Sequence, residues 1–129
     1  TYQADGLIVS TPTGSTAYNL SAGGSIIHPT ISAVQVTPIC AHSVSSRALI
    51  LPTEYKIKIT PSKEVHVTDE FEAQIAIDGQ DFVLFNNKNN KLKEITITES
   101  DYTIPLIEIN PLSFHNKLAD RIRWCKRID

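Results

Sequence analysis

The sequence contains no methionine and only two cysteines among its 129 residues. Cys40 and Cys125 are far apart and lack metal-ligand spacing, which is more typical of reduced cytosolic thiols than of a secreted disulfide framework. The sequence does not exclude a disulfide between these two cysteines. We expect a cytoplasmic protein. A chain that begins at Thr1 and lacks methionine is compatible with a fragment from inside a longer protein.

The sequence also lacks a charge excess and a long apolar run. Twelve basic and fourteen acidic residues give a net charge of -2, whereas nucleic acid or an anionic membrane would favour a basic excess. No apolar run approaches the ~18 residues that a membrane span needs, and the first ten residues do not resemble a signal peptide. The remaining composition, 41% hydrophobic and 20% charged, is typical of one soluble globular domain without a nucleic-acid or membrane partner.

Short segments of alternating apolar and polar residues dominate the chain. Such alternation has the period of a half-buried strand, and the segments are separated by close turns rather than by helices. We therefore predict a mainly β fold, an antiparallel β-sandwich. The predicted strands lie at residues 6–10, 55–59, 65–67, 73–77, 82–85, 95–97 and 104–109.

Two segments have helical features. A short helix is predicted at residues 15–20, stopped by Gly23 and Gly24. A second is predicted at residues 113–126, with Ser113 as its N-cap and an apolar stripe at Phe114, Leu118, Ile122 and Cys125. We expect this second helix to dock on the sheet.

The most informative segment is residues 5–24, DGLIVSTPTGSTAYNLSAGG. An apolar strand leads into a stretch dense in Ser, Thr and Gly and then into a short helix, which gathers hydroxyls and free backbone N–H groups as a ligand site would. Tyr18 offers a flat ring and a hydroxyl. The residues alone leave a second interpretation open, in which the hydroxyls only cap a helix. The segment has neither the P-loop pattern nor the Rossmann pattern.

The sequence STPTGSTAY at residues 10–18, with ADG before it and LSAGG after it, closely resembles the signature of NAD kinases. Further similar blocks are HPT at 28–30, TPICAHSVSSRALILP at 37–52, IDGQ at 77–80 and the segment around 114–124. The resemblance covers nearly the whole chain and implies the β-rich C-terminal domain of that family, here spanning residues 1–129. NAD kinases transfer the terminal phosphate of ATP, or of polyphosphate, to the 2′-hydroxyl of the adenosine ribose of NAD and so form NADP.

The resemblance also implies site residues. Asp5 would contact the nicotinamide-ribose side of NAD, and a cluster after the first strand would line the adenosine end. That cluster consists of Thr13, Thr16, Ala17, Tyr18 and Ser21, with Ser10 as a weaker candidate. Asp78 and Gln80 would approach the ligand from the IDGQ block at 77–80, although Asp78-Gly79 is also a favoured hairpin turn. His42 and Arg47 are interpreted as structural or interface residues.

The sequence departs from the family pattern at several positions. Ser25, Ala41 and Ala48 stand where proline is common, and Gln3 stands where many members carry a basic residue. The family's GGDG motif and Asn-Glu pair are absent. Because phosphoryl transfer needs groups that position the phosphates and neutralise their charge, usually with Mg²⁺, we expect no catalytic residue and no metal ligand in this chain. The complete enzyme would bind Mg²⁺ or another divalent metal together with ATP.

Several hypotheses remain beside a kinase fragment that is inactive without its N-terminal lobe. The alternatives are a stand-alone nucleotide-binding or regulatory module, a domain related to lipid kinases, and a purely structural β-sandwich. The resemblance further implies a homodimer or homotetramer.

Overall fold

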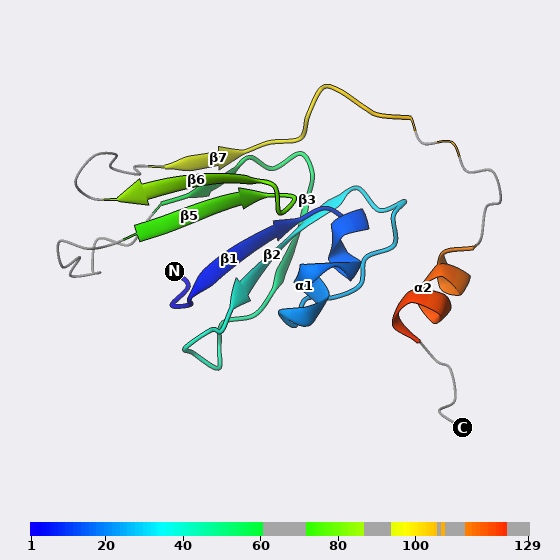
Figure 1. The fold of residues 1–129 in the computed structure, drawn as a ribbon, viewed down its shortest axis with the longest axis horizontal. Helices are drawn as coiled ribbons and strands as arrows, with labels where there is room; N and C mark the ends of the chain where they lie inside the picture. Colours follow the sequence, from blue (N-terminus) through cyan, green and yellow to red (C-terminus); the bar gives the residue numbers. More distant parts are fainter. Residues whose placement is uncertain (61–71, 87–93, 106, 108–112, 124–129) are drawn as a thin grey trace.

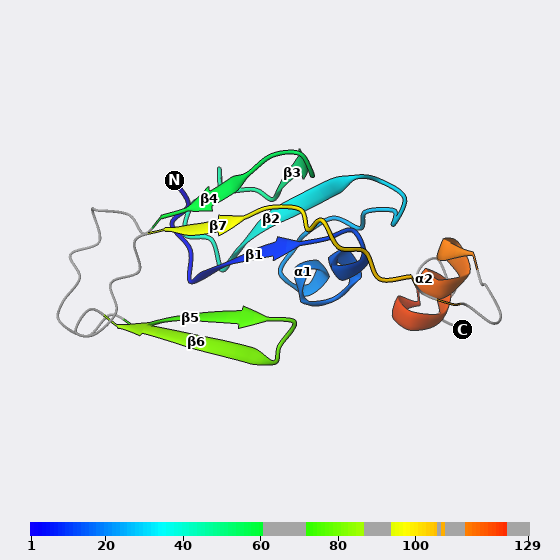
Figure 2. The ribbon, with the colours of Figure 1, turned by 90° about the horizontal axis from the view of Figure 1, so that it is seen from above.

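The computed structural model describes residues 1–60, 72–86, 94–105, 107 and 113–123 (Figure 1). Every strand pairing within these residues is antiparallel, as the sequence predicts. In the described part of the chain, seven strands form one sheet of three strands and two sheets of two strands, with orders β1-β2-β3, β4-β7 and β5-β6. Figure 2 shows β5 and β6 as a layer separate from the other strands. The predicted strand at 65–67 lies outside the described residues.

The three-stranded sheet contains two strands that alternation did not reveal. β1 (Gly6–Ser10) pairs with β2 (Ala33–Ile39), and β2 also pairs with β3 (Leu49–Pro52). β2 was not predicted, although residues 34–37 alternate between apolar and polar, because Pro38 argues against the middle of a sheet. The Ile39 carbonyl accepts from Asp5 N on the β1 side at 3.0 Å. The backbone nitrogen of neighbouring Pro38 therefore faces the β3 side of the strand. The pairing with β3 ends at Val36 and Leu49, so no hydrogen bond between the strands is lost because Pro38 lacks an N–H.

The β5-β6 sheet is a tight hairpin. β5 (Glu72–Ile77) and β6 (Asp81–Asn86) are joined by a turn in which Gln80 N donates to the Ile77 carbonyl at 3.0 Å. Both central residues of the turn have positive φ, 48° at Asp78 and 72° at Gly79. Two positive φ angles define the type I′ turn, whose twist matches that of antiparallel strands. The Asp-Gly pair thus forms the hairpin turn that its sequence favours.

The β4-β7 sheet has one apolar and one polar face. β4 (Ile57–Ile59) pairs with β7 (Ile95–Ile97), so that Ile57 lies opposite Ile97 and Lys58 lies opposite Thr96. Lys58 Nζ lies 3.0 Å from Glu94 Oε1. The hydrogen bond from Lys58 lowers the pKa of the Glu94 carboxyl, and because both groups are solvent-exposed we expect little effect on stability.

The N-terminal helical segment is broken into two short pieces. η1 (Thr13–Thr16) is a 3-10 helix and α1 (Tyr18–Ser21) is a single α-helical turn. Ala17 separates them because its backbone, at φ -94° and ψ -136°, is not helical. A single helix at 15–20 was therefore only partly correct.

The C-terminal helix α2 (Phe114–Ile122) begins as predicted. The Ser113 hydroxyl accepts from Asn116 N at 3.3 Å, and Arg123 ends the helix in the left-handed conformation. The docking prediction was wrong: Figures 1 and 2 place α2 beyond α1 and apart from the three sheets. The Phe114 ring of α2 packs edge-on against the His28 ring, with ring centroids 4.8 Å apart. Within the described residues, no helix combines the length and apolarity that a membrane crossing needs.

The interior of the described chain is unusually polar. Its buried hydrophobic residues are Ile27, Ala33, Val36 and Leu118. The largest fully buried side chains are instead Gln35, Asn19, Thr37 and Ser15. Because apolar residues normally fill a core and buried polar groups need partners, hydrogen bonding must organise much of this fold.

The β5-β6 turn gives a first test. We expect Gly79→Val to lower the free energy of unfolding by about 1–2 kcal/mol, because a β-branched residue is strained at positive φ. Gly79→Asn should cost less, since asparagine tolerates this conformation. Urea denaturation of the 129-residue chain would measure both variants, and equal losses would show that the backbone conformation is not the cause.

Candidate functional site

The site is built at the end of β1, where the chain leaves the sheet and turns. Ser15 N donates to the Pro12 carbonyl at 3.1 Å, and Ala17 N donates to the Gly14 carbonyl at 3.0 Å. The Thr11 hydroxyl accepts from Gly14 N at 3.2 Å. These local bonds fold residues 11–21, which we call the turn segment, into η1 and α1.

The turn segment presents most of its predicted site residues to solvent. Thr13, Ala17 and Ser21 are exposed, and Thr16 is half-buried. Tyr18 is the most prominent, with 63% of its surface exposed despite its size. Ser10, by contrast, is buried, and its hydroxyl donates to the Thr11 carbonyl at 2.9 Å. The segment therefore offers hydroxyls and a phenol ring on one outward surface.

The residue after Tyr18 points the other way. Asn19 is 1% exposed, and its side chain lies on the side of the turn segment that meets β2. Its Nδ2 donates to the Ser15 carbonyl at 3.1 Å, and its Oδ1 accepts from Thr37 Oγ1 at 2.6 Å. A Cβ at Gly24 would overlap the Asn19 amide, so glycine at this position leaves the room that the amide occupies.

Gln35 extends this network to the segment after α1. Its amide lies 2.9 Å from both Ser25 N and the Ser25 carbonyl. With Nε2 turned toward the carbonyl, Gln35 makes both of these backbone bonds; in the opposite orientation, it accepts from Asn19 Nδ2 at 2.9 Å. A proline at position 25 would lack the N–H that Gln35 can accept.

Ser15 makes a similar connection. Its hydroxyl donates to the Pro12 carbonyl at 2.6 Å and accepts from Ile27 N at 3.0 Å, so it joins the two ends of the loop. We call Ser15, Asn19, Gln35 and Thr37 the polar cluster. No buried side-chain polar atom among the described residues lacks a hydrogen-bond partner. None of these four residues was predicted as a site residue; for Gln35 and Thr37 the signal in the sequence is their polar character within the apolar strand 33–39.

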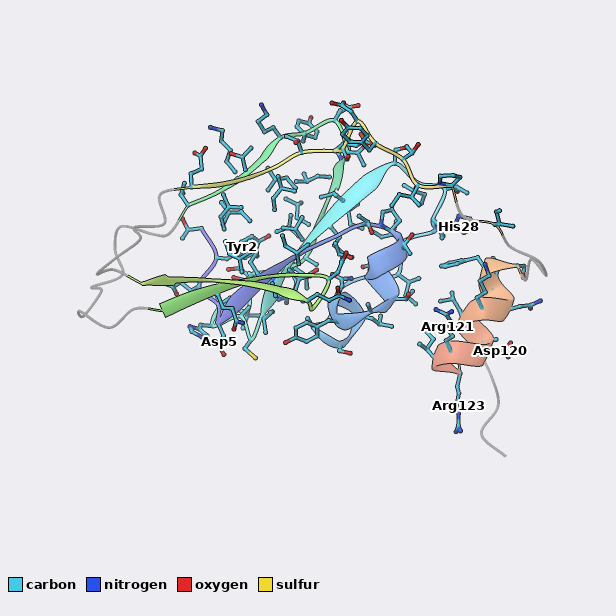
Figure 3. All side chains as sticks on the ribbon, turned by 45° about the horizontal axis from the view of Figure 1, so that its top comes forward. Tyr2, Asp5, His28, Asp120, Arg121 and Arg123 are labelled. Carbon is cyan, nitrogen blue, oxygen red and sulfur yellow. The ribbon has the colours of Figure 1, made fainter. Side chains whose placement is uncertain are left out.

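A second part of the site lies at the start of β1. Asp5 Oδ1 accepts from His42 Nε2 at 2.9 Å, although both side chains are about 60% exposed (60% for His42 and 63% for Asp5). His42 N also donates to the Gln3 carbonyl at 2.8 Å. Figure 3 shows Asp5 near Tyr2 at this end of β1, and the Tyr2 hydroxyl donates to the Arg47 carbonyl at 2.9 Å. His42, which the sequence analysis assigned to structure, thus contacts a predicted site residue directly.

An open hollow of about 340 Å³ lies between the residues that follow α1 and those that follow β2. Ala22 and Gly23, which follow α1, line one side, and Cys40, Ala41 and Arg47, which follow β2, line the other. The chain turns sharply there, because Cys40 has a positive φ of 49°. Neither Tyr18 nor Asp5 lines this hollow.

Asp78 and Gln80 are exposed in the β5-β6 turn. In Figures 1 and 2 this turn points toward the end of the molecule where β1 ends and the turn segment begins. Asp78 and Gln80 thus lie at the end of the β5-β6 hairpin that faces this end of β1.

The chemistry of this surface suits binding more than catalysis. Its groups are mostly neutral hydroxyls, a phenol and backbone amides, with carboxylates at Asp5 and Asp78 and the His42 imidazole beside Asp5. Within the residues that the structure describes, no three His, Cys, Asp or Glu side chains gather in a way that could hold a metal ion. Such neutral groups match sugar hydroxyls and base edges.

The fold and site together define a β-rich domain with a solvent-exposed turn segment on a buried polar base. Residues 1–109 match the family described as the ATP-NAD kinase C-terminal domain. Because the match covers well over half of the chain, the protein belongs to this family. The resemblance inferred from residues 10–18 is confirmed.

Curated relatives and solved structures agree with this assignment. The chain is 43% identical over 122 residues to an NAD(+) kinase of Saccharomyces cerevisiae, and this match covers 95% of the chain but 22% of that enzyme. It is 36% identical to an NAD kinase of Thiobacillus denitrificans, covering 98% of the chain and 40% of that protein. The chain thus spans less than half the length of these relatives.

Two solved structures share the fold. Yeast NADH kinase, complexed with NADH, matches 99% of the chain at a TM-score of 0.65 and 26% identity, over 35% of its own chain. An NAD kinase from Archaeoglobus fulgidus, complexed with ATP, matches 78% of the chain at a TM-score of 0.62 and 31% identity, over 34% of its own chain.

The polar cluster predicts a difference between two neighbouring hydroxyls. Ser15→Ala should lower the free energy of unfolding by about 1–3 kcal/mol, because it leaves the buried Ile27 N–H without its acceptor. Thr16→Ala should cost less than about 0.5 kcal/mol, because its hydroxyl makes only one long, exposed bond. Urea denaturation would compare them, and an unchanged Ser15→Ala stability would contradict the role given to the cluster.

Proposed function

We propose that this chain is the NAD-binding part of an NAD kinase. The complete enzyme would transfer the terminal phosphate of ATP, or of polyphosphate, to the 2′-hydroxyl of the adenosine ribose of NAD. The observation that carries the proposal is the outward surface of the turn segment, whose sequence matches the family and whose geometry leaves Tyr18 available to a ligand.

The proposed contacts follow the two parts of the site. The turn segment, through Thr13, Thr16, Ala17, Tyr18 and Ser21, lines the adenosine end. Asp5 binds the nicotinamide-ribose side, held by His42. Asp78 and Gln80 complete the pocket from the β5-β6 turn, and Ser10 remains the weaker candidate because its hydroxyl is buried and already bonded.

Phosphate transfer itself belongs to the remainder of the enzyme in this proposal. A divalent metal such as Mg²⁺ would neutralise the phosphates of ATP there, and this chain supplies orientation of NAD. The short coverage of the relatives supports the division, because most of their length lies outside the matched region.

Self-association is part of the same proposal. Large apolar side chains remain exposed on the edge strand β3, at Leu49 and Ile50, and in the extended stretch that contains Ile104 and Ile107. These apolar side chains would be removed from water if they packed against another protein surface. We propose a homodimer or homotetramer, and light scattering coupled to size exclusion would contradict it by giving a monomeric mass at micromolar concentration.

NAD binding is the direct test of the pocket. We expect saturable binding in a calorimetric titration of the chain, and we expect Tyr18→Ala to raise the Kd about tenfold or more, because stacking on a base is worth ~1–3 kcal/mol. Tyr55→Ala is the matched control, since Tyr55 is also exposed, at 58%, but lies outside the site. Equal effects of both substitutions would contradict the assigned site.

An assay of NADP formation tests whether phosphate transfer needs the remainder of the enzyme. We expect the chain alone to form no NADP from NAD and ATP with Mg²⁺, and we expect joining it to the N-terminal region of the Saccharomyces cerevisiae NAD(+) kinase to give turnover. A coupled dehydrogenase assay would measure NADP. Formation of NADP by the isolated chain at an ordinary enzymatic rate, about 1 per second or faster, would overturn the view that catalysis needs another lobe.

A further inference from the structure

We infer that Asn19, Gln35 and Thr37 are positioning residues, which hold the turn segment in its binding conformation without touching the ligand. The identity of the ligand rests on the proposed function, whereas the positioning itself rests on the contacts of the polar cluster. None of the three residues was implicated by its sequence.

The inference starts from the weakness of α1. It has four residues, and helices much shorter than about 12 residues are marginal in water on their own. Within α1 the buried residue is Asn19, while Tyr18 and Ser21 are exposed. The side-chain hydrogen bonds from α1 to β2 come from this one amide, while Leu20 is half-buried.

That amide is held from several directions. Thr37 donates to its oxygen at 2.6 Å, and its nitrogen donates to the Ser15 carbonyl at 3.1 Å. Gln35 lies beside it at 2.9 Å and also contacts both backbone polar atoms of Ser25. Hydrogen bonds are directional, so this network restricts the rotation of α1 more narrowly than an apolar contact would.

Tyr18 and Asn19 are adjacent, so the restriction is transmitted directly. When the Asn19 side chain is fixed beneath the helix, the rotation of α1 is set, and the Tyr18 side chain stays in its exposed position. A preformed site loses less conformational entropy on binding than one that must order itself. Removing the cluster should therefore weaken ligand binding even though its members lie beneath the binding surface.

The test separates positioning from stability. Asn19→Leu removes the amide at similar volume, and Thr37→Val removes the hydroxyl that bonds it. Val36→Ala is the matched control, because Val36 is 6% exposed on the same strand and its side chain points to the opposite face. Thr37→Ser, which keeps the hydroxyl, should restore the behaviour of the parent chain.

Two readouts are compared on the full 129-residue chain. Amide hydrogen exchange without ligand should accelerate about tenfold or more in residues 13–24 of Asn19→Leu and Thr37→Val, but not in Val36→Ala. Calorimetry should show an NAD Kd raised about tenfold in the same two variants, which corresponds to about 1.4 kcal/mol. Thermal melting records how much stability each variant loses.

The outcomes separate the two proposals. If Asn19→Leu fails to fold, Thr37→Val and Thr37→Ser decide the comparison. Exchange in residues 13–24 that stays at the parent's rate in Thr37→Val, or that rises equally in Val36→Ala, overturns the positioning role. If the unmodified chain binds no NAD while exchange behaves as expected, the proposed function fails and the positioning role stands.

Discussion

The hydrogen-bonded amide of Asn19 is the contact on which the arrangement of the site most depends. It lies where the turn segment, the loop after α1 and β2 meet, and it bonds to groups from the turn segment and β2. Leaving a buried amide unpaired would cost several kcal/mol, so the surrounding backbone must keep its donors and acceptors in place. The polar cluster therefore specifies one arrangement of the loop rather than merely burying it.

The polar cluster explains how a segment rich in loop-forming residues adopts one conformation. Residues 10–18 contain serine, threonine, glycine and proline, a composition typical of loops. Their own short-range bonds form η1, but only Ser15 connects the turn to Ile27 across the loop. The outward hydroxyls of Thr13 and Ser21 are available because other polar groups of the segment are satisfied beneath them.

The small apolar core has a related consequence. The described chain buries few large hydrophobic side chains, and exposes apolar residues on β3 and beyond β7. A domain that is organised by polar contacts near its site and leaves apolar surface elsewhere is suited to packing against other protein surfaces. The family's curated members, which are much longer than this chain, are consistent with such a context.

The sequence by itself determined the antiparallel class, the Asp-Gly hairpin turn, the N-cap of α2 and the family. These features depend on local preferences or on a contiguous signature: two adjacent residues define the turn, and Ser113 caps the helix through a residue three positions away. The tertiary structure alone decided that 33–39 is the central strand, that α2 lies apart from the sheets, that His42 holds Asp5 and that Asn19 meets Thr37. Contacts between residues 18 or 37 positions apart in the chain leave no local pattern, because only the folded backbone brings their side chains together.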